Sequence, residues 1–106
     1  MKIFKIYTLP QFEEDKHLLF TKFEQIEIEN ILSDLLIDGD KKGKPLGYNF
    51  FIEKKIQHKR IYYLIYDELN IILLVAGSNK KTQQKTITEI KMLLPKYKEY
   101  VYKFFI

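Results

Sequence analysis

Three strand-like runs follow one another closely in the middle of the chain. They span residues 48–56, 60–66 and 71–76 and are rich in Ile, Tyr and Phe, which favour extended structure. The connections at 57–59 and 67–70 are short and polar, and connections of that length join antiparallel strands. The last run is continuously apolar, which is typical of a central strand that is buried on both faces. The sequence therefore predicts an antiparallel sheet built around these runs.

Helical and strand patterns flank this region on both sides. Residues 2–7 alternate between polar and apolar side chains and predict a short strand, and residues 11–20 predict a helix that begins at Pro10. A capping box from Thr21 to Glu24 opens an amphipathic helix that we expect to end at Asp38–Gly39–Asp40. Further helices are predicted at 82–94, up to the breaker Pro95, and at 96–104, which gives the order βααβββαα.

These elements predict one α+β domain over residues 1–106. It has a small, mainly antiparallel four-stranded sheet, an N-terminal αα-hairpin and C-terminal helices, and we expect the helices to lie on one face of the sheet. Residues 41–47 are expected to form a loop rich in Gly and Pro, and residues 77–79 to leave the sheet.

Composition excludes several classes of protein. The chain has no cysteine, so it has neither a disulfide framework nor a thiolate zinc site, which fits a reducing cytoplasmic location. The N-terminus turns acidic too early for a signal peptide, and the longest apolar run is too short to span a bilayer. With two histidines and no calcium-loop pattern around Asp34, Asp38 and Asp40, we expect no bound metal. We also expect no cofactor and no membrane partner.

Charge divides the chain into two unlike parts. Residues 1–40 contain four Lys and nine Asp or Glu, whereas residues 41–106 contain thirteen Lys, one Arg and five Asp or Glu. The basic part includes the predicted strands and the loop that leaves them, which suits a polyanion, and RNA is the first candidate. Two solvated faces of opposite sign are the alternative.

Side chains alternate along a strand, so the two faces of the sheet can be assigned. The apolar pairs Ile52/Ile56 and Ile61/Ile65 should meet the helices. The opposite, open face then collects polar residues, namely Glu53, Lys55, Arg60 and Tyr62. Lysines there would hold phosphates, and Tyr62 would stack on a base. The residues expected to contact RNA are Lys54, Tyr62, Lys81 and Lys85.

Four segments in chain order resemble the RelE/ParE toxin superfamily of type II toxin–antitoxin systems, and its RelE-like branch in particular. They are GKPLG at 43–47, EKKI at 53–56, KRIYYLIYDELNIILLV at 59–75 and AGSNKKTQQKTI at 76–87. The resemblance implies a small sheet packed on helices. It also implies ribosome-dependent, metal-independent cleavage of messenger RNA, which inhibits translation, and a cognate antitoxin protein that neutralises the toxin.

In such a toxin the 2′-hydroxyl of the RNA attacks the adjacent phosphate. The resemblance makes Lys55 the candidate base or phosphate contact, Arg60 the clamp on the scissile phosphate, and Lys80 or Lys81 the stabiliser of developing charge. Many members have a Tyr or His where this chain has Thr86, so Tyr62, Glu53 or His58 would have to replace it. Two alternatives stay open: a ParE-like inhibitor of DNA gyrase without nuclease activity, and a catalytically inactive RNA- or protein-binding module.

Overall fold

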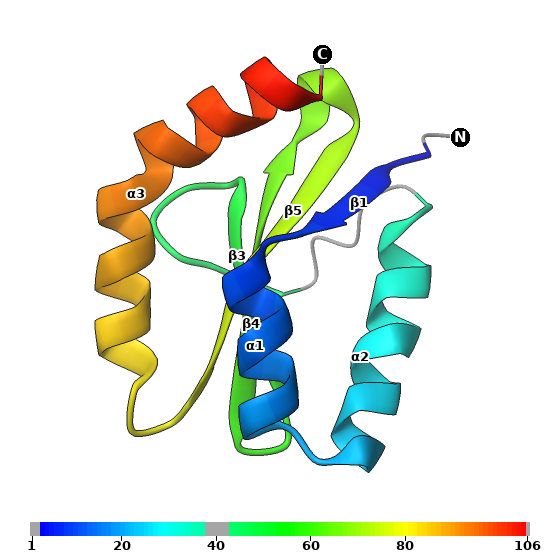
Figure 1. The fold of residues 1–106 in the computed structure, drawn as a ribbon, viewed down its shortest axis with the longest axis vertical. Helices are drawn as coiled ribbons and strands as arrows, with labels where there is room; N and C mark the ends of the chain where they lie inside the picture. Colours follow the sequence, from blue (N-terminus) through cyan, green and yellow to red (C-terminus); the bar gives the residue numbers. More distant parts are fainter. Residues whose placement is uncertain (1–2, 38–42, 106) are drawn as a thin grey trace.

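The computed structural model describes residues 3–37 and 43–105. A five-stranded sheet has the order β1-β5-β4-β3-β2, in which β1 runs parallel to β5 and the other neighbours are antiparallel (Figure 1). The strands are β1 Lys5–Thr8, β2 Lys44–Pro45, β3 Phe51–Ile56, β4 Lys59–Tyr66 and β5 Ile71–Asn79. The helices are α1 Pro10–Leu19, α2 Lys22–Leu35 and α3 Gln83–Phe104, with a 3₁₀ turn at Asp67–Leu69.

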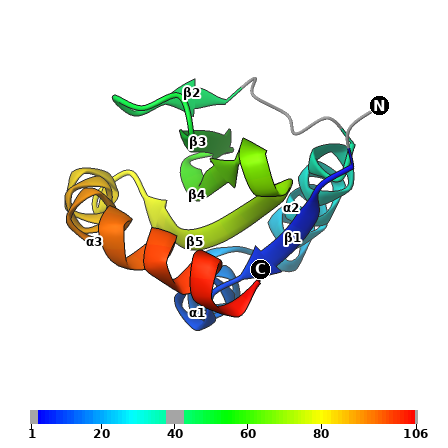
Figure 2. The same ribbon diagram turned by 90° about the horizontal axis from the view of Figure 1, so that it is seen from above.

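Helices cover both faces of the sheet (Figure 2). On one face α1 and α2 pack on Ile52, Ile56, Ile61 and Ile65. This confirms the prediction that these four residues meet the helices. The expectation that the other face is open is wrong, because α3 packs there on Tyr62, Leu64 and Leu73. The reason lies in β4, whose two faces are both apolar beyond its first residues, so that water must be excluded from both sides.

The sheet differs from the predicted one in three places. Lys44 and Pro45, expected in a loop, form an edge strand that pairs with Glu53 and Ile52. Residues 48–50 form a turn instead of the start of a strand, because Leu46 N–H donates to the Phe51 carbonyl at 2.9 Å and closes a tight hairpin. Strand β5 continues through residues 77–79, which were expected to leave the sheet.

One long helix replaces the two C-terminal helices that the sequence predicts. Helix α3 continues through Pro95 and bends across the end of the sheet (Figure 1). A proline inside a helix removes one hydrogen bond and costs about 3 kcal/mol. Packing beyond the bend offsets this cost, because Val101 is fully buried and the Phe105 ring stacks on Tyr7 at 3.9 Å between centroids. The predicted end of α2 at Asp38–Gly39–Asp40 lies outside the described residues.

The start of α2 holds the β3–β4 hairpin. The predicted capping box is confirmed, since Glu24 N–H donates to Thr21 Oγ1 at 3.1 Å and Thr21 N–H donates to Glu24 Oε1 at 2.8 Å. Lys59, at the start of β4, donates from Nζ to the same Glu24 oxygen at 2.6 Å. The hydrogen bond from Lys59 lowers the pKa of Glu24, with the Thr21 bonds acting in the same direction against burial. This pair fixes the hairpin tip against α2.

The lowered pKa of Glu24 predicts a pH-dependent contribution to stability. A carboxylate with a depressed pKa stabilises the folded state above its unfolded pKa, and this stabilisation is lost as pH falls through the folded pKa. We expect Glu24→Gln to lower Tm at pH 7, and the gap between wild type and variant to close as pH falls from 5 to 3 in thermal unfolding followed by circular dichroism. Glu14→Gln, which alters an exposed carboxylate on α1, is the control. A gap that is constant with pH would contradict the assignment.

Candidate functional site

Three polar side chains form a row at the end of the sheet where β3 turns into β4. Lys55 lies opposite Arg60, and Arg60 lies opposite Ser78 on its other side. Lys55 is exposed, Arg60 is half-buried and Ser78 is fully buried. The row therefore leads from solvent toward the start of α3, and it brings together Lys55 and Arg60, two of the three residues expected to be catalytic.

A β-bulge in β5 turns Ser78 toward this row. The pairing of β4 with β5 shifts register between Tyr62 and Tyr63, so that Val75 is an extra residue in β5. Val75 and Ala76 consequently both belong to the core on the α3 side. The alternation of side chains is therefore reversed after Ala76, and Ser78 faces the α3 side with Tyr62. Bulges of this kind commonly re-aim a side chain beside a functional site.

Buried polar groups lie directly beneath the row. The Tyr62 hydroxyl and Ser78 Oγ are 2.9 Å apart, and Gln83 at the start of α3 donates to Glu53 Oε2 at 2.9 Å. Burial raises the pKa of Tyr62 to about 12, although its hydrogen bond to Ser78 acts in the opposite direction. Tyr62 is fully buried, so the prediction that it stacks on a base is wrong. Its hydroxyl stays protonated at neutral pH and serves the packing between the sheet and α3.

Arg60 is held by the hairpin turn. Its NH1 group donates to the backbone carbonyl of His58 at 2.9 Å. Its Nε is buried and has no hydrogen-bond partner among the described residues. A guanidinium has five N–H donors, so donors on its two terminal nitrogens remain beyond the one bonded to His58, and such donors beside other cations suit the oxygens of a phosphate.

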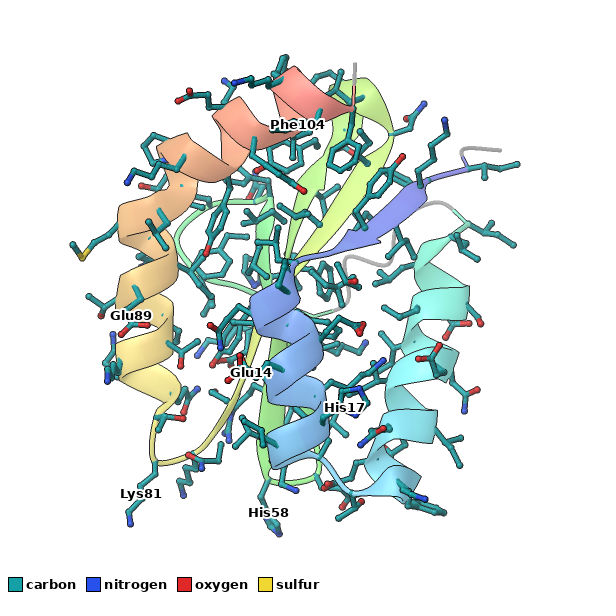
Figure 3. All side chains as sticks on the ribbon, viewed as in Figure 1. Glu14, His17, His58, Lys81, Glu89 and Phe104 are labelled. Carbon is teal, nitrogen blue, oxygen red and sulfur yellow. The ribbon has the colours of Figure 1, made fainter. Side chains whose placement is uncertain are left out.

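More basic side chains surround the hairpin tip. His58, Lys80 and Lys81 line a shallow depression of about 440 Å³ together with Lys59 and Asn79. Figure 3 shows His58 and Lys81 at the same end of the molecule. Lys80, the third expected catalytic residue, follows Asn79 at the same end of the sheet as the row, and it lines this depression, which Lys55, Arg60 and Ser78 do not line. His58 is exposed in a turn, but the turn brings it beside these lysines, so it is the nearest histidine to the row.

Two of the residues expected to contact RNA lie elsewhere. Lys54 is half-buried in β3 and, by the alternation of the strand, faces the side of α1 and α2. Lys85 lies 4.0 Å from Glu89 and lines a groove between α1 and α3, as does Thr86. Neither lysine belongs to the row.

The sequence analysis missed Ser78 and Gln83 as parts of this site. The register shift that aims Ser78 leaves no mark in the pattern of apolar residues, because both strands are apolar throughout. Gln83 could have been found only from knowing that α3 covers this face. In residues 3–37 and 43–105 the structure brings together no three His, Asp or Glu side chains able to hold a metal ion, and no helix there is long and apolar enough to cross a bilayer.

The bond between Tyr62 and Ser78 predicts a non-additive pair of substitutions. Removing one partner leaves a buried hydroxyl unpaired, which costs about 1–3 kcal/mol, whereas removing both can be nearly neutral. We expect Tyr62→Phe and Ser78→Ala each to lower the free energy of unfolding in urea, and the double variant to lose less than their sum. Strict additivity would mean that the two hydroxyls do not interact.

Comparisons with known proteins agree with this architecture. The sequence matches no protein-family profile and no curated protein. A double mutant of the Escherichia coli toxin RelE in the free state is similar over 84% of this chain and 93% of its own, with a TM-score of 0.66 and 12% identity. A chain of the RelBE2 toxin–antitoxin complex of Mycobacterium tuberculosis is similar over 74% of this chain and 99% of its own, with a TM-score of 0.59 and 19% identity. A chain of the intact E. coli RelBE toxin–antitoxin complex is similar over 73% of this chain and 95% of its own, with a TM-score of 0.60 and 12% identity. The chain therefore has the fold of the RelE toxins.

Proposed function

We propose that this chain is the toxin of a type II toxin–antitoxin system and cleaves messenger RNA on the ribosome without a metal ion. The observation that carries the proposal is the pairing of Lys55 with Arg60, with Lys80 and Lys81 at the same end of a sheet that has the fold of RelE toxins. Several cations around one solvent-facing strand end suit a single phosphate and its neighbours.

The proposed reaction uses the RNA's own nucleophile. The 2′-oxygen attacks the adjacent phosphorus, its proton passes to a base, and the bond to the 5′-oxygen breaks as that oxygen takes a proton, leaving a cyclic phosphate. Arg60 would hold two phosphate oxygens with its planar fork, and Lys55 and Lys80 would stabilise the charge that develops on them. The protein thus contributes mainly position and electrostatic stabilisation.

Proton transfer needs a group that RNA can reach. Tyr62 is excluded by its burial and raised pKa, and Glu53 is 7% exposed and accepts a hydrogen bond from Gln83. His58 is exposed at the hairpin tip and lines the same depression as Lys80 and Lys81. We assign it the proton transfer, since imidazole is the side chain most often used for this step near neutral pH.

An antitoxin is the proposed protein partner. The solved structures with this fold include toxin–antitoxin complexes from two organisms. By analogy, an antitoxin encoded beside this chain would neutralise it by covering the basic end, and the toxin would act in the cytoplasm, where ribosomes are available.

Arg60 provides the first test. On induction in a bacterial host, we expect wild type to arrest growth and produce discrete in-frame cuts in a reporter messenger RNA, read by primer extension. Arg60→Ala should lose both, and Arg60→Lys should lose most of the cleavage, because a lysine keeps the charge but not the fork. Lys22→Ala, which removes an exposed cation on α2, should behave as wild type.

Each other result has a defined meaning. Cleavage by Arg60→Ala at the wild-type level would remove Arg60 from the site. Growth arrest with DNA damage and intact messenger RNA would replace the proposal with a gyrase inhibitor of the same fold. Harmless expression of wild type would favour an inactive binding module.

The two histidines form a matched pair for testing proton transfer. His58→Ala should reduce the cleavage rate by roughly 10²-fold or more, as expected for loss of a general acid or base. His17→Ala, an exposed histidine on α1, should leave the rate unchanged. Rates of ribosome-programmed cleavage in a reconstituted translation system would measure both. Equal rates for wild type and His58→Ala would assign the proton transfer to another group or to water.

A further inference from the structure

A second concavity lies at the opposite end of β4 from the row. It has a volume of about 660 Å³ and lies between the turn at residues 48–50, the end of β4 and the middle of α3. Tyr48 and Phe50 line one side, and Lys91, Pro95 and Lys98 of α3 line the other. We call it the α3 groove. None of the residues assigned to the proposed chemistry lines it.

Two exposed aromatic rings form one wall of the α3 groove. The Tyr48 and Phe50 rings lie 5.1 Å apart at 36°, and these residues are 48% and 37% exposed. Their backbone is fixed, since Phe51 N–H donates to the Tyr48 carbonyl at 3.2 Å and Ile65 N–H donates to the Phe50 carbonyl at 2.8 Å. Aromatic rings held in solvent on a fixed turn provide a stacking surface that loses little entropy on binding.

Cations form the facing wall. Lys91 and Lys98 are seven residues apart on α3, which separates them by about 10 Å along the helix axis. The Lys91 ammonium lies against the turn, 3.5 Å from where a Cβ at Gly47 would be, and no described carboxylate forms a salt bridge with it. Glu68 closes one end of the groove and accepts a hydrogen bond from the Tyr102 hydroxyl at 2.6 Å. That hydrogen bond lowers the pKa of Glu68, so it is an anion that can accept from a donor group.

We propose that the α3 groove binds a nucleotide of single-stranded RNA that extends from the row. The inference rests on the proposed function and adds a substrate subsite to it. A base would stack on Tyr48 and Phe50, its phosphate would contact Lys91, and an exocyclic amino group could donate to Glu68.

The short distance between the row and the α3 groove favours RNA over a peptide in the groove. Arg60 and Tyr66 are six residues apart in β4, so the two ends are separated by roughly 20 Å, a span that a few nucleotides cover. Lys55 and Lys91 form no salt bridge with a described carboxylate, and both ends belong to the side of the sheet where α3 packs. A strand that is clamped at Arg60 would have this basic and aromatic surface within reach.

Binding of uncleavable RNA tests the subsite independently of catalysis. The probes are fluorescein-labelled 2′-O-methyl RNAs, a hexamer that can span both ends and a trimer that can cover the row alone, with fluorescence anisotropy as the measurement. Tyr48→Ala should weaken hexamer binding by about 5- to 150-fold, the range that loss of one stacked base gives, and Lys91→Ala should also weaken it because a phosphate contact is lost. Both variants should leave trimer binding unchanged. Phe23→Ala on α2 and Lys96→Ala on α3 change an exposed aromatic and an exposed lysine outside the groove, and should have no effect.

The outcomes separate the subsite from the nuclease. If Arg60→Ala weakens hexamer binding and the groove variants do not, the subsite is overturned while the proposed function stands. If the groove variants weaken binding but wild type makes no cuts in cells, the subsite holds and the nuclease fails. If Tyr48→Ala loses antitoxin binding but keeps its affinity for the hexamer, the groove binds a peptide and the proposal is overturned. The proposal is also overturned if the wild-type protein does not bind the hexamer.

Discussion

Burial of β4 and β5 on both faces is the constraint on which the rest of the structure depends. From Ile61 to Tyr66 and from Ile71 to Ala76 nearly every side chain is apolar, and all are buried. Burial of apolar surface stabilises the folded state by roughly 25 cal/mol per Å², so exposing either face of the sheet to water would cost many kcal/mol of stability. Two layers of helix are therefore required. The long α3 provides the second layer, and the packing of its last turns explains why it continues past Pro95.

The same constraint decides where chemistry can occur. Because helices cover both faces, polar side chains on the central strands can reach solvent only where the strands extend beyond the helices. That is the hairpin end, where exposure falls from Lys55 through Arg60 to Ser78. Beneath it the hydroxyl pair of Tyr62 and Ser78 and the bond from Gln83 to Glu53 satisfy the polar groups that burial would otherwise leave unpaired. The row is thus the solvent-facing edge of a buried polar layer.

Local patterns in the sequence predicted the elements well, and non-local packing explains what they missed. Strands β3 and β4, the turn at Asp67–Asn70 and the capping box at Thr21 are set by neighbouring residues, and the structure has all of them. By contrast, the bulge beside Tyr62 and the helical Pro95 depend on contacts between distant segments. For the same reason the sequence placed Lys55 and Arg60 together but left Tyr62 on an open face.

Segregation of charge gives the proposed site a direction. Helices α1 and α2 carry half of the acidic residues, whereas the hairpin tip and the loop into α3 carry Lys55, Arg60, Lys80 and Lys81. The ion pair of Glu24 with Lys59 lies at the boundary between these two regions and neutralises the lysine at the start of β4. Because charges are screened over about 8 Å at physiological salt, a polyanion at the tip would feel the nearby lysines more than the acidic helices behind them. RNA would then approach along the α3 side, where the row and the α3 groove both lie, rather than across α1 and α2.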